Sequence, residues 1–315
     1  MQNAAGHYIN LGCSPENTAS MSSTIREIAK LERNLDIDLW PKRKSYPLGF
    51  PNLKSTISGH TVNILSWKSL EQNEFIDDVI INSYLQLICG FAQSNLNFNV
   101  VFLDVHLVQN IIFDQKLGAF GKWLGKIDLR NYEVLLIPIN AHEHWTLLVA
   151  VPKLKLIIYL DSKHGKLNSG FFDRICAFLQ LYWQPGKRLS YKQWTLFTPE
   201  DIPTQFRLKG SKQVMTMNCG PHLVSWSHII CSGKPVEFND SDMDSVRCRL
   251  AEILLKNNGI DQRTSSHKRR MVLRNERDKG EILLTVRRTR MVQQSSLPIL
   301  GCKSIFDLCA SLHKL

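Results

Sequence analysis

The stretch 144-HWTLLVAVPKLKLIIYLDS-162 contains two apolar runs that are separated by a short turn at Pro152-Lys153. A third apolar run, YEVLLIPI, ends shortly before it. Short apolar runs bounded by polar residues or proline are typical of strands, and their close spacing favours direct neighbours in a sheet. We therefore predict an antiparallel meander with strands at 132–139, 144–151 and 155–160.

Segments with helical spacing lie on both sides of this meander. FIDDVIINSYLQLICG, at 75–90, places apolar residues on one face behind the capping candidates Asp77 and Asp78, and Gly90 is expected to end it. Further helices are predicted at 170–183, at 219–231 and from Asp240 or Ser241 to Gly259, with one more strand at 193–198. Together these elements predict an α+β domain over 60–260. It lies between a partly irregular N-terminal extension, 1–59, and a loosely ordered tail, 261–315.

Composition indicates an intracellular protein in a reducing compartment. The eight cysteines are scattered and none forms a C-x-x-C pair, which argues against a disulfide framework and against a cysteine zinc site. No long apolar run is present and the N-terminus does not resemble a signal peptide, so no membrane partner is expected.

Basic charge is concentrated in the tail. The chain carries a net charge of +11, and residues 261–315 hold 12 Lys or Arg against 5 Asp or Glu. The clusters Lys268-Arg269-Arg270 and Arg287-Arg288 are compatible with nuclear import or with weak phosphate binding, and equally with a solvated segment. No aromatic residue is interleaved with them, so no nucleic-acid-reading module is expected, and the clusters favour the nucleus over the cytoplasm.

Three residues of the middle region have the types that cysteine hydrolysis requires. His144 opens a predicted strand, Asp161 ends the next one, and Cys219 opens a predicted helix. Neighbouring antiparallel strands bring the start of one beside the end of the other, and the positive end of a helix dipole stabilises a thiolate. We expect Cys219 as nucleophile, His144 as base and Asp161 as the residue that orients the base.

Simpler interpretations exist for each of these residues. Cys219 is also compatible with a core cysteine that begins a helix, and Asp161 with a turn-capping carboxylate. His142 and His144 would share one face of a strand, as the two halves of a metal site do, but no neighbouring C-x-x-C or carboxylate pair supplies the remaining ligands.

The same stretches resemble the ubiquitin-like-protein-specific cysteine peptidases, that is, the SUMO/sentrin-specific protease type of peptidase family C48. The stretch at 144–162 resembles the segment in which this family carries an HW pair, two strands and a DS pair. Gln213-Val-Met-Thr-Met-Asn-Cys219-Gly220 resembles the family's Gln, five residues, Cys-Gly, and FIDDVIINSYLQLI resembles its WLND-type segment. The resemblance implies a papain-like fold of the adenain/ubiquitin-like-protease type, with the catalytic Cys at a helix N-terminus.

Further site residues follow from the resemblance alone. Gln213 would be the side-chain donor to the oxyanion, together with the backbone N–H of Cys219. Trp145 and Phe75 would wall the channel for the modifier's Gly-Gly tail, and Asp78 would grip the modifier's surface. The chain departs from the family at Phe75, where Trp is usual, at Asn218, where Asp is usual, and in the bulkier loop residues Met215, Thr216 and Met217.

The function implied by the resemblance is cleavage after the C-terminal Gly of a ubiquitin-like modifier, SUMO first and NEDD8 second, without metal or organic cofactor. Two alternatives stay open at this point. One is a catalytically inactive module of the same fold that binds the modifier. The other is an acetyltransferase, since some enzymes of related fold use the same Cys and His to move acetyl groups.

Overall fold

The computed structural model describes residues 39, 45–46, 55–57, 59–113, 127–183, 194–209, 211–234, 236–257 and 312–313. All of them belong to the compact unit Asp36–Leu315. The predicted N-terminal extension and basic tail lie almost entirely outside the described residues. No helix of the described part is long and apolar enough to cross a membrane.

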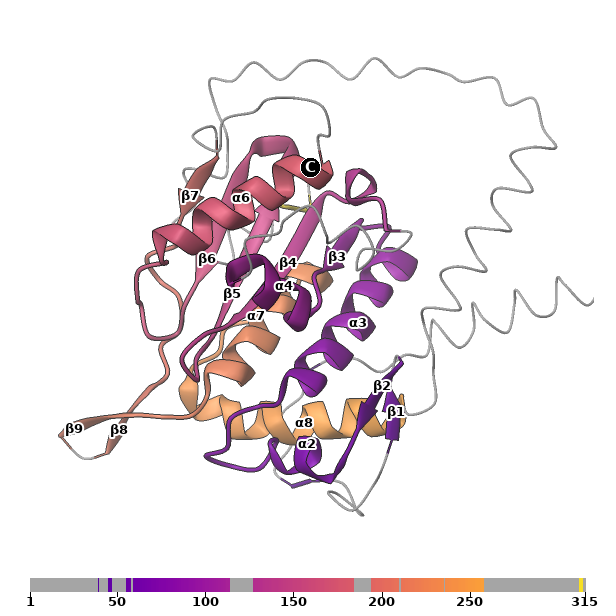
Figure 1. The fold of residues 1–315 in the computed structure, drawn as a ribbon. Coiled ribbons are helices and arrows are strands. Elements are labelled where there is room, and N and C mark those ends of the chain that lie inside the picture. Colours follow the sequence, from indigo (N-terminus) through magenta and orange to yellow (C-terminus); the bar gives the residue numbers. More distant parts are fainter. Residues whose placement is uncertain are drawn as a thin grey trace, which may run out of the picture. The chain divides into compact units, whose positions relative to one another are not determined.

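A five-stranded mixed sheet forms the centre of this unit, in the order β3-β4-β5-β6-β7 (Figure 1). The long antiparallel ladders join β4 to β5 and β5 to β6, whereas the short outer strands pair in parallel. The predicted meander is thereby confirmed. The strand bounds are β3 Val100–Phe102, β4 Val134–Asn140, β5 Trp145–Val151, β6 Leu156–Leu160 and β7 Thr195–Phe197.

Helices cover both faces of the sheet, which explains why every residue of β5 and β6 is buried. On one face, α4 (Val105–Phe113) and α6 (Ser169–Trp183) pack on alternate residues of the central strands. Toward the other face, α7 (Cys219–Ser232) packs against β5 and against α3 (Asp78–Asn95). Behind α7 lies α8 (Met243–Lys256), so α7 is enclosed and nearly all its residues are buried.

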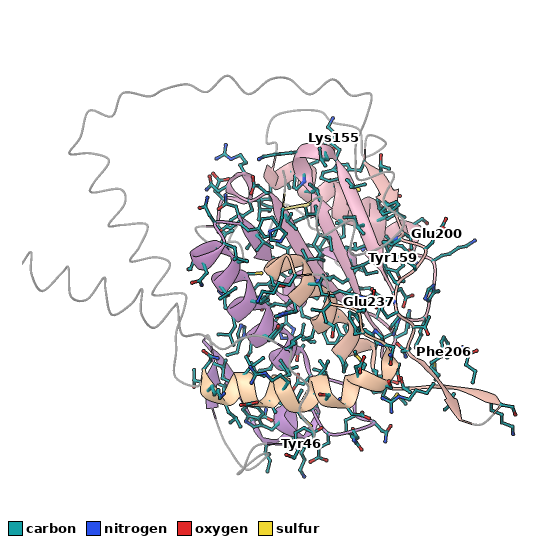
Figure 2. The ribbon with its side chains drawn as sticks, turned by 180° about the vertical axis from the view of Figure 1, so that it is seen from behind. Tyr46, Lys155, Tyr159, Glu200, Phe206 and Glu237 are labelled. Carbon is teal, nitrogen blue, oxygen red and sulfur yellow. The ribbon has the colours of Figure 1, made fainter. Side chains whose placement is uncertain are left out.

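Smaller elements complete the unit. They are β1 (Ser55–Ile57), β2 (His60–Val62), α2 (Ile64–Lys68) and the 3-10 turns η2 (Leu129–Asn131), η3 (Pro152–Leu154) and η5 (Asp240–Asp242). A separate two-stranded hairpin, β8 (Phe206–Lys209) with β9 (Lys212–Met215), lies apart from the main sheet in Figure 1. Figure 2, the view from behind, labels Phe206 where this hairpin begins, and Lys155 and Tyr159 near the two ends of β6.

Two predicted helix ends differ from the structure. Gly90 does not end α3, which continues to Asn95, because buried Ala92 keeps the helix packed beyond the glycine. The last helix begins with the turn η5, whose cap is Asn239 rather than Asp240 or Ser241. Asn239 and Asp242 form a reciprocal capping box there, which satisfies free backbone N–H groups at the start of the helix.

Candidate active site

The turn between β4 and β5 fixes the position of His144. Ala141 and His144 exchange two backbone hydrogen bonds of 3.1 Å around His142 and Glu143, whose φ angles are 52° and 56°. Two central residues with positive φ are the mark of a type I′ hairpin turn. His142 therefore lies in the turn and not on the strand, so the paired strand face of the metal alternative does not form. Across the described ranges, no group of three or more His, Cys, Asp and Glu is arranged to hold a metal ion.

His144 and Asp161 meet at the same edge of the sheet. Extending the β5/β6 register places Asp161 opposite Thr146, two residues from His144 and on the same face. The Nε2 atom of His144 lies 2.6 Å from Oδ1 of Asp161, and both side chains are largely buried. Because an ionised carboxylate only accepts hydrogen bonds, Nε2 carries the proton.

Asp161 also closes the turn that follows β6, so its capping role and its contact with His144 coexist. Its carboxylate accepts the backbone N–H groups of Lys163 (2.8 Å) and Gly165 (2.9 Å) and the hydroxyl of Tyr159 (3.2 Å). A Cβ at Gly165 would lie 2.6 Å from Oδ2 of Asp161, so only glycine allows this close approach. The turn therefore holds the carboxylate rigidly against His144.

This arrangement shifts the pKa of both partners. Burial alone would raise the pKa of Asp161, but the hydrogen bonds from His144, Lys163 and Gly165 outweigh it and lower that pKa. Burial alone would lower the pKa of His144, but Asp161 and then Cys219 outweigh it and raise that pKa. Asp161 is thus a carboxylate at neutral pH, and it stabilises a positive charge on the imidazole.

Cys219 is the first residue of α7 and is 1% exposed. It is the second titratable side chain that raises the pKa of His144. The remaining ring nitrogen of His144, Nδ1, is buried and has no hydrogen-bond partner in the described part of the chain. The structure therefore brings the three predicted triad residues together and leaves Nδ1 able to accept the thiol proton.

Ile76 contacts both Trp145 and Gly220, the residue after Cys219. Its carbonyl accepts the indole N–H of Trp145 at 2.9 Å, and Trp145 is 1% exposed. A Cβ at Gly220 would lie 2.8 Å from Cβ of Ile76, which explains why glycine follows Cys219. Phe75, the neighbour of Ile76, is 38% exposed and presents an aromatic surface beside this contact.

Asp78 lies in the first turn of α3, and its Oδ2 lies 2.9 Å from Nε2 of the exposed His106 side chain. Burial raises the pKa of Asp78 to about 6, and the adjacent carboxyl of Asp77 adds to this rise. Asp78 therefore changes its charge close to neutral pH. It lies next to the segment that carries Phe75 and Ile76.

The structure does not place Gln213 among these residues. Gln213 lies in β9, opposite Leu208, and its side chain is exposed. A different glutamine, Gln205, is 1% exposed and bonds to Ser162, the residue after Asp161, and to Thr216, three residues before Cys219. Its Oε1 accepts the hydroxyl of Ser162 at 2.6 Å, and its Nε2 donates to the carbonyl of Thr216 at 2.8 Å.

Backbone bonds add to these contacts of Gln205. Its N–H donates to the carbonyl of Ser162 at 2.9 Å, and its carbonyl accepts the N–H of Thr216 at 3.0 Å. Gln205 thus connects the residue after Asp161 with the loop before Cys219. The family's spacing, a Gln six residues before the Cys, selects Gln213 and not Gln205. The reason is that the hairpin β8–β9 lies between Gln205 and Cys219. The alternating stretch FRLKGSKQVM, with Gly-Ser at its centre, is the sequence signal that predicts this hairpin.

A family comparison agrees with this geometry. Residues 74–257, more than half of the chain, match the Ulp1 protease family, C-terminal catalytic domain. The chain belongs to the Ulp1 protease family. Cysteine peptidases of the C48 type make up this family, as the sequence resemblance implied, and the matched residues include His144, Asp161 and Cys219, the three predicted triad residues.

Curated relatives of this Ulp1 family chain include sentrin-specific protease 2 of Pongo abelii. It is 26% identical over 200 residues, which cover 59% of this chain and 31% of that protein. A putative ubiquitin-like-specific protease 1B of Arabidopsis thaliana is 24% identical over 226 residues, which cover 68% of this chain and 62% of that protein. The chain therefore matches less than two thirds of the length of either relative.

Solved structures show that the Ulp1 fold is present. The catalytic domain of a Ulp1-like SUMO protease from Chaetomium thermophilum superposes with a TM-score of 0.54 and 16% identity, over 74% of this chain and 88% of that one. The Ulp1 protease domain in complex with Smt3, the yeast orthologue of SUMO, gives a TM-score of 0.51 and 15% identity, over 73% and 95%. The predicted α+β, papain-like fold of this type is confirmed.

Proposed function

We propose that this chain is a thiol peptidase that cleaves after the C-terminal glycine of a ubiquitin-like modifier, with SUMO as the first candidate and NEDD8 as the second. The observation that carries the proposal is the buried pair of His144 and Asp161 at 2.6 Å, with Nδ1 of His144 unpartnered within the described residues and Cys219 beside it. A base held by a carboxylate and facing a thiol at a helix N-terminus is the arrangement that activates a cysteine nucleophile.

Each step of hydrolysis has a group to perform it. His144 takes the thiol proton at Nδ1 while Sγ of Cys219 bonds to the carbonyl carbon of the modifier's last glycine, and the carbonyl oxygen becomes an oxyanion. Collapse of this intermediate breaks the C–N bond, and His144 returns the proton to the leaving amine. Water then attacks the thioester, His144 accepts its proton, and the modifier leaves as a carboxylate with the thiol restored.

The oxyanion requires donors that are already in place. The backbone N–H of Cys219 is one candidate, since it is among the free N–H groups at the start of α7. Gln205 is the better placed side chain. Its amide nitrogen has a second hydrogen beside the one given to Thr216, and hydrogen bonds to Ser162 and Thr216 fix both ends of the amide. Gln213 lacks such support because it is exposed on β9.

The choice of modifier rests on the relatives. The similar Ulp1 structure holds Smt3, and the similar curated proteins are sentrin-specific or ubiquitin-like-specific proteases, which favours SUMO. Trp145, buried and bonded to Ile76, and the half-exposed Phe75 would form walls of the channel for the modifier's tail. Asp78, at the start of α3, would contact the modifier's surface.

Turnover of a fluorogenic SUMO whose C-terminus is an aminocoumarin amide tests the proposal. We expect hydrolysis by the wild type and none by Cys219→Ala. Tight SUMO binding without turnover would instead support the inactive binding module. Acetyl transfer from acetyl-CoA through an acyl-Cys219, with no peptidase activity, would support the acetyltransferase.

Two glutamine variants form a matched pair within this assay. We expect Gln205→Ala to lower kcat about 10²-fold, because one oxyanion donor is lost, and Gln213→Ala to leave kcat within about 2-fold. A larger loss of kcat in Gln213→Ala than in Gln205→Ala would identify Gln213 as the donor instead.

A further inference from the structure

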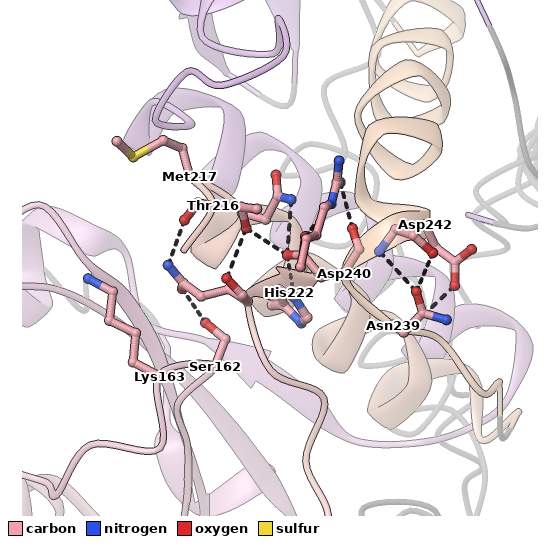
Figure 3. A network of polar contacts seen from close by, with 12 residues as sticks. Ser162, Lys163, Thr216, Met217, His222, Asn239, Asp240 and Asp242 are labelled. Carbon is pink, nitrogen blue, oxygen red and sulfur yellow. Dashed lines mark hydrogen bonds and ion pairs between the residues drawn. The ribbon is translucent and has the colours of Figure 1, made fainter. Parts of the chain in front are cut away.

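One buried carboxylate, that of Asp240, gathers donors from several separate segments (Figure 3). Asp240 is the first residue of η5 and is 3% exposed. Its Oδ2 accepts Nε of Arg207 at 2.5 Å. Its Oδ1 accepts Oγ1 of Thr216 at 2.7 Å, Nδ2 of Asn218 at 3.0 Å and Nε2 of His222 at 3.4 Å.

Burial and hydrogen bonding determine the protonation states of Asp240 and His222. Burial alone would raise the pKa of Asp240, but the hydrogen bonds from His222, Thr216 and Asn218 outweigh it and lower the pKa to about 2. Complete burial lowers the pKa of His222, so this ring is neutral and donates through Nε2. Arg207 supplies the positive charge, and it also donates to the backbone carbonyl of Asp240 at 2.7 Å.

The partners of Asp240 lie where the hairpin β8–β9 joins the catalytic residues. Arg207 stands two residues after Gln205, on the outgoing strand. Thr216 and Asn218 belong to the loop Thr216–Asn218, here called the nucleophile loop, which returns to Cys219. Thr216 also bonds to Gln205: its carbonyl accepts Nε2 of Gln205, and its backbone N–H donates to the carbonyl of Gln205. The Asp240 carboxylate therefore fixes both ends of the hairpin at the positions that carry the proposed oxyanion donor and the nucleophile.

Asn218 is complementary to this carboxylate. Its Nδ2 donates to Asp240, while its Oδ1 accepts Nη2 of Arg247 at 3.3 Å. An aspartate at 218, the residue that the family resemblance leads one to expect, has no hydrogen to donate. It would set a second buried carboxylate against Asp240, which is unfavourable. Asn218 and Asp240 are thus matched to each other in this chain.

We propose that Asp240 is a positioning residue for the reaction. Together with Asn218, it holds the nucleophile loop and Gln205 in the positions that the reaction requires. This inference rests on the proposed peptidase function. Asp240 acts through other residues, so its loss affects the chemical step more than modifier binding. A misplacement of about 1 Å costs on the order of 10²-fold in rate.

The variants Asp240→Asn, Asn218→Asp and the reciprocal double variant test the inference, with Asp242→Asn as the control. Asp242 lies in the same η5 turn but bonds to the N–H of Asn239. Four quantities are compared: kcat and KM on the fluorogenic SUMO, the rate of capture by SUMO ending in propargylamide, and the thermal midpoint. The propargylamide probe bonds to Sγ without forming a carbonyl oxyanion, so it reports the thiol and the channel alone.

We expect each single variant to lower kcat about 10²-fold while KM and the capture rate stay within about 3-fold. The double variant restores the donor–acceptor match and is expected to return kcat to within about 10-fold of the wild type, a non-additivity that marks direct coupling. Asp242→Asn is expected to keep the wild-type kcat.

The inference is overturned if Asp240→Asn keeps the wild-type kcat, if kcat, capture and midpoint fall together, or if the double variant shows no recovery. Should Asp240→Asn not fold, Thr216→Val removes one donor with little change of shape. It is expected to lower kcat about 10-fold at constant KM, and a wild-type kcat in this variant overturns the inference. A wild type that neither hydrolyses nor is captured refutes the peptidase function itself, and this inference with it.

Discussion

Replacing Arg247 by methionine is expected to separate two segments that meet at the active site. Arg247, in α8, is fully buried. Its guanidinium donates to carbonyls of the segment before α3 and of the nucleophile loop: Ser69 (3.1 Å), Glu71 (3.0 Å), Glu74 (2.7 Å) and Met217 (2.7 Å). One segment leads into Phe75 and Ile76, and the other leads into Cys219. Arg247 therefore connects the segment of the predicted channel residues with the loop that leads to the proposed nucleophile.

The size of the effect follows from these bonds. A hydrogen bond to a charged group contributes about 1.5–3 kcal/mol, but burial of the guanidinium, which also lowers its pKa, offsets part of the total. Methionine fills similar space and leaves the carbonyls without their donor. We expect a loss of about 4 kcal/mol in the free energy of unfolding. For a domain of this size, that corresponds to a fall of roughly 8–16 °C in the thermal midpoint.

Thermal unfolding measures this loss of stability. Arg247→Lys keeps the charge but not the planar fork, so we expect about half the loss of stability. Lys256→Met is the control, because Lys256 lies on the same helix, is largely exposed, and pairs with Glu252 at 2.8 Å. Lys256→Met is expected to lower the free energy of unfolding by less than about 1 kcal/mol. A midpoint of Arg247→Met within about 2 °C of that control would refute the reasoning.

Three further predictions concern the site. Asp161→Asn is expected to lower kcat about 10³–10⁴-fold and to lower the pKa of His144, which a pH titration of the His144 ring by NMR measures. Because the pKa of Asp78 is raised to about 6, its charge is complete above that pH and lost below it. The KM for SUMO should therefore rise between pH 7 and 5, and Asp78→Asn should show a high KM with little change over this range. Gly165→Ala places a Cβ 2.6 Å from Oδ2 of Asp161 and is expected to cost about 1–3 kcal/mol of stability and at least about 10-fold in kcat. Gly170→Ala is the control: it places a Cβ 3.1 Å from Oδ1 of Asn168, just before α6, and it should change kcat little.

Local sequence was sufficient to predict the scaffold of the triad. The apolar runs of β4, β5 and β6 define a meander, and a meander brings the start of β5 beside the end of β6 whatever the rest of the chain does. His144 and Asp161 could therefore be paired from their positions alone. The helix that opens at Cys219 was equally clear, because its apolar residues continue for three turns.

Residues that act across long sequence distances could not be predicted in this way. Gln205 was missed because the hairpin β8–β9 lengthens the path to Cys219. Asp240 and Arg247 stand in the charged stretch DSDMDSVRCR, which on its pattern belongs to a solvated helix start. Both are buried only because the nucleophile loop and the segment before α3 fold over them. No periodicity within α8 carries that information.

Mass spectrometry of Cys219 after exposure to electrophilic modifiers tests the central claim most directly. The chain is incubated with SUMO, NEDD8 and ubiquitin probes that carry a C-terminal electrophile, and each cysteine is then mapped. We predict one thioether, at Cys219, formed fastest with SUMO and absent in Cys219→Ala. No adduct with any of the three probes, or an adduct that persists in Cys219→Ala, would contradict the assignment of Cys219 as the nucleophile of a modifier-specific peptidase.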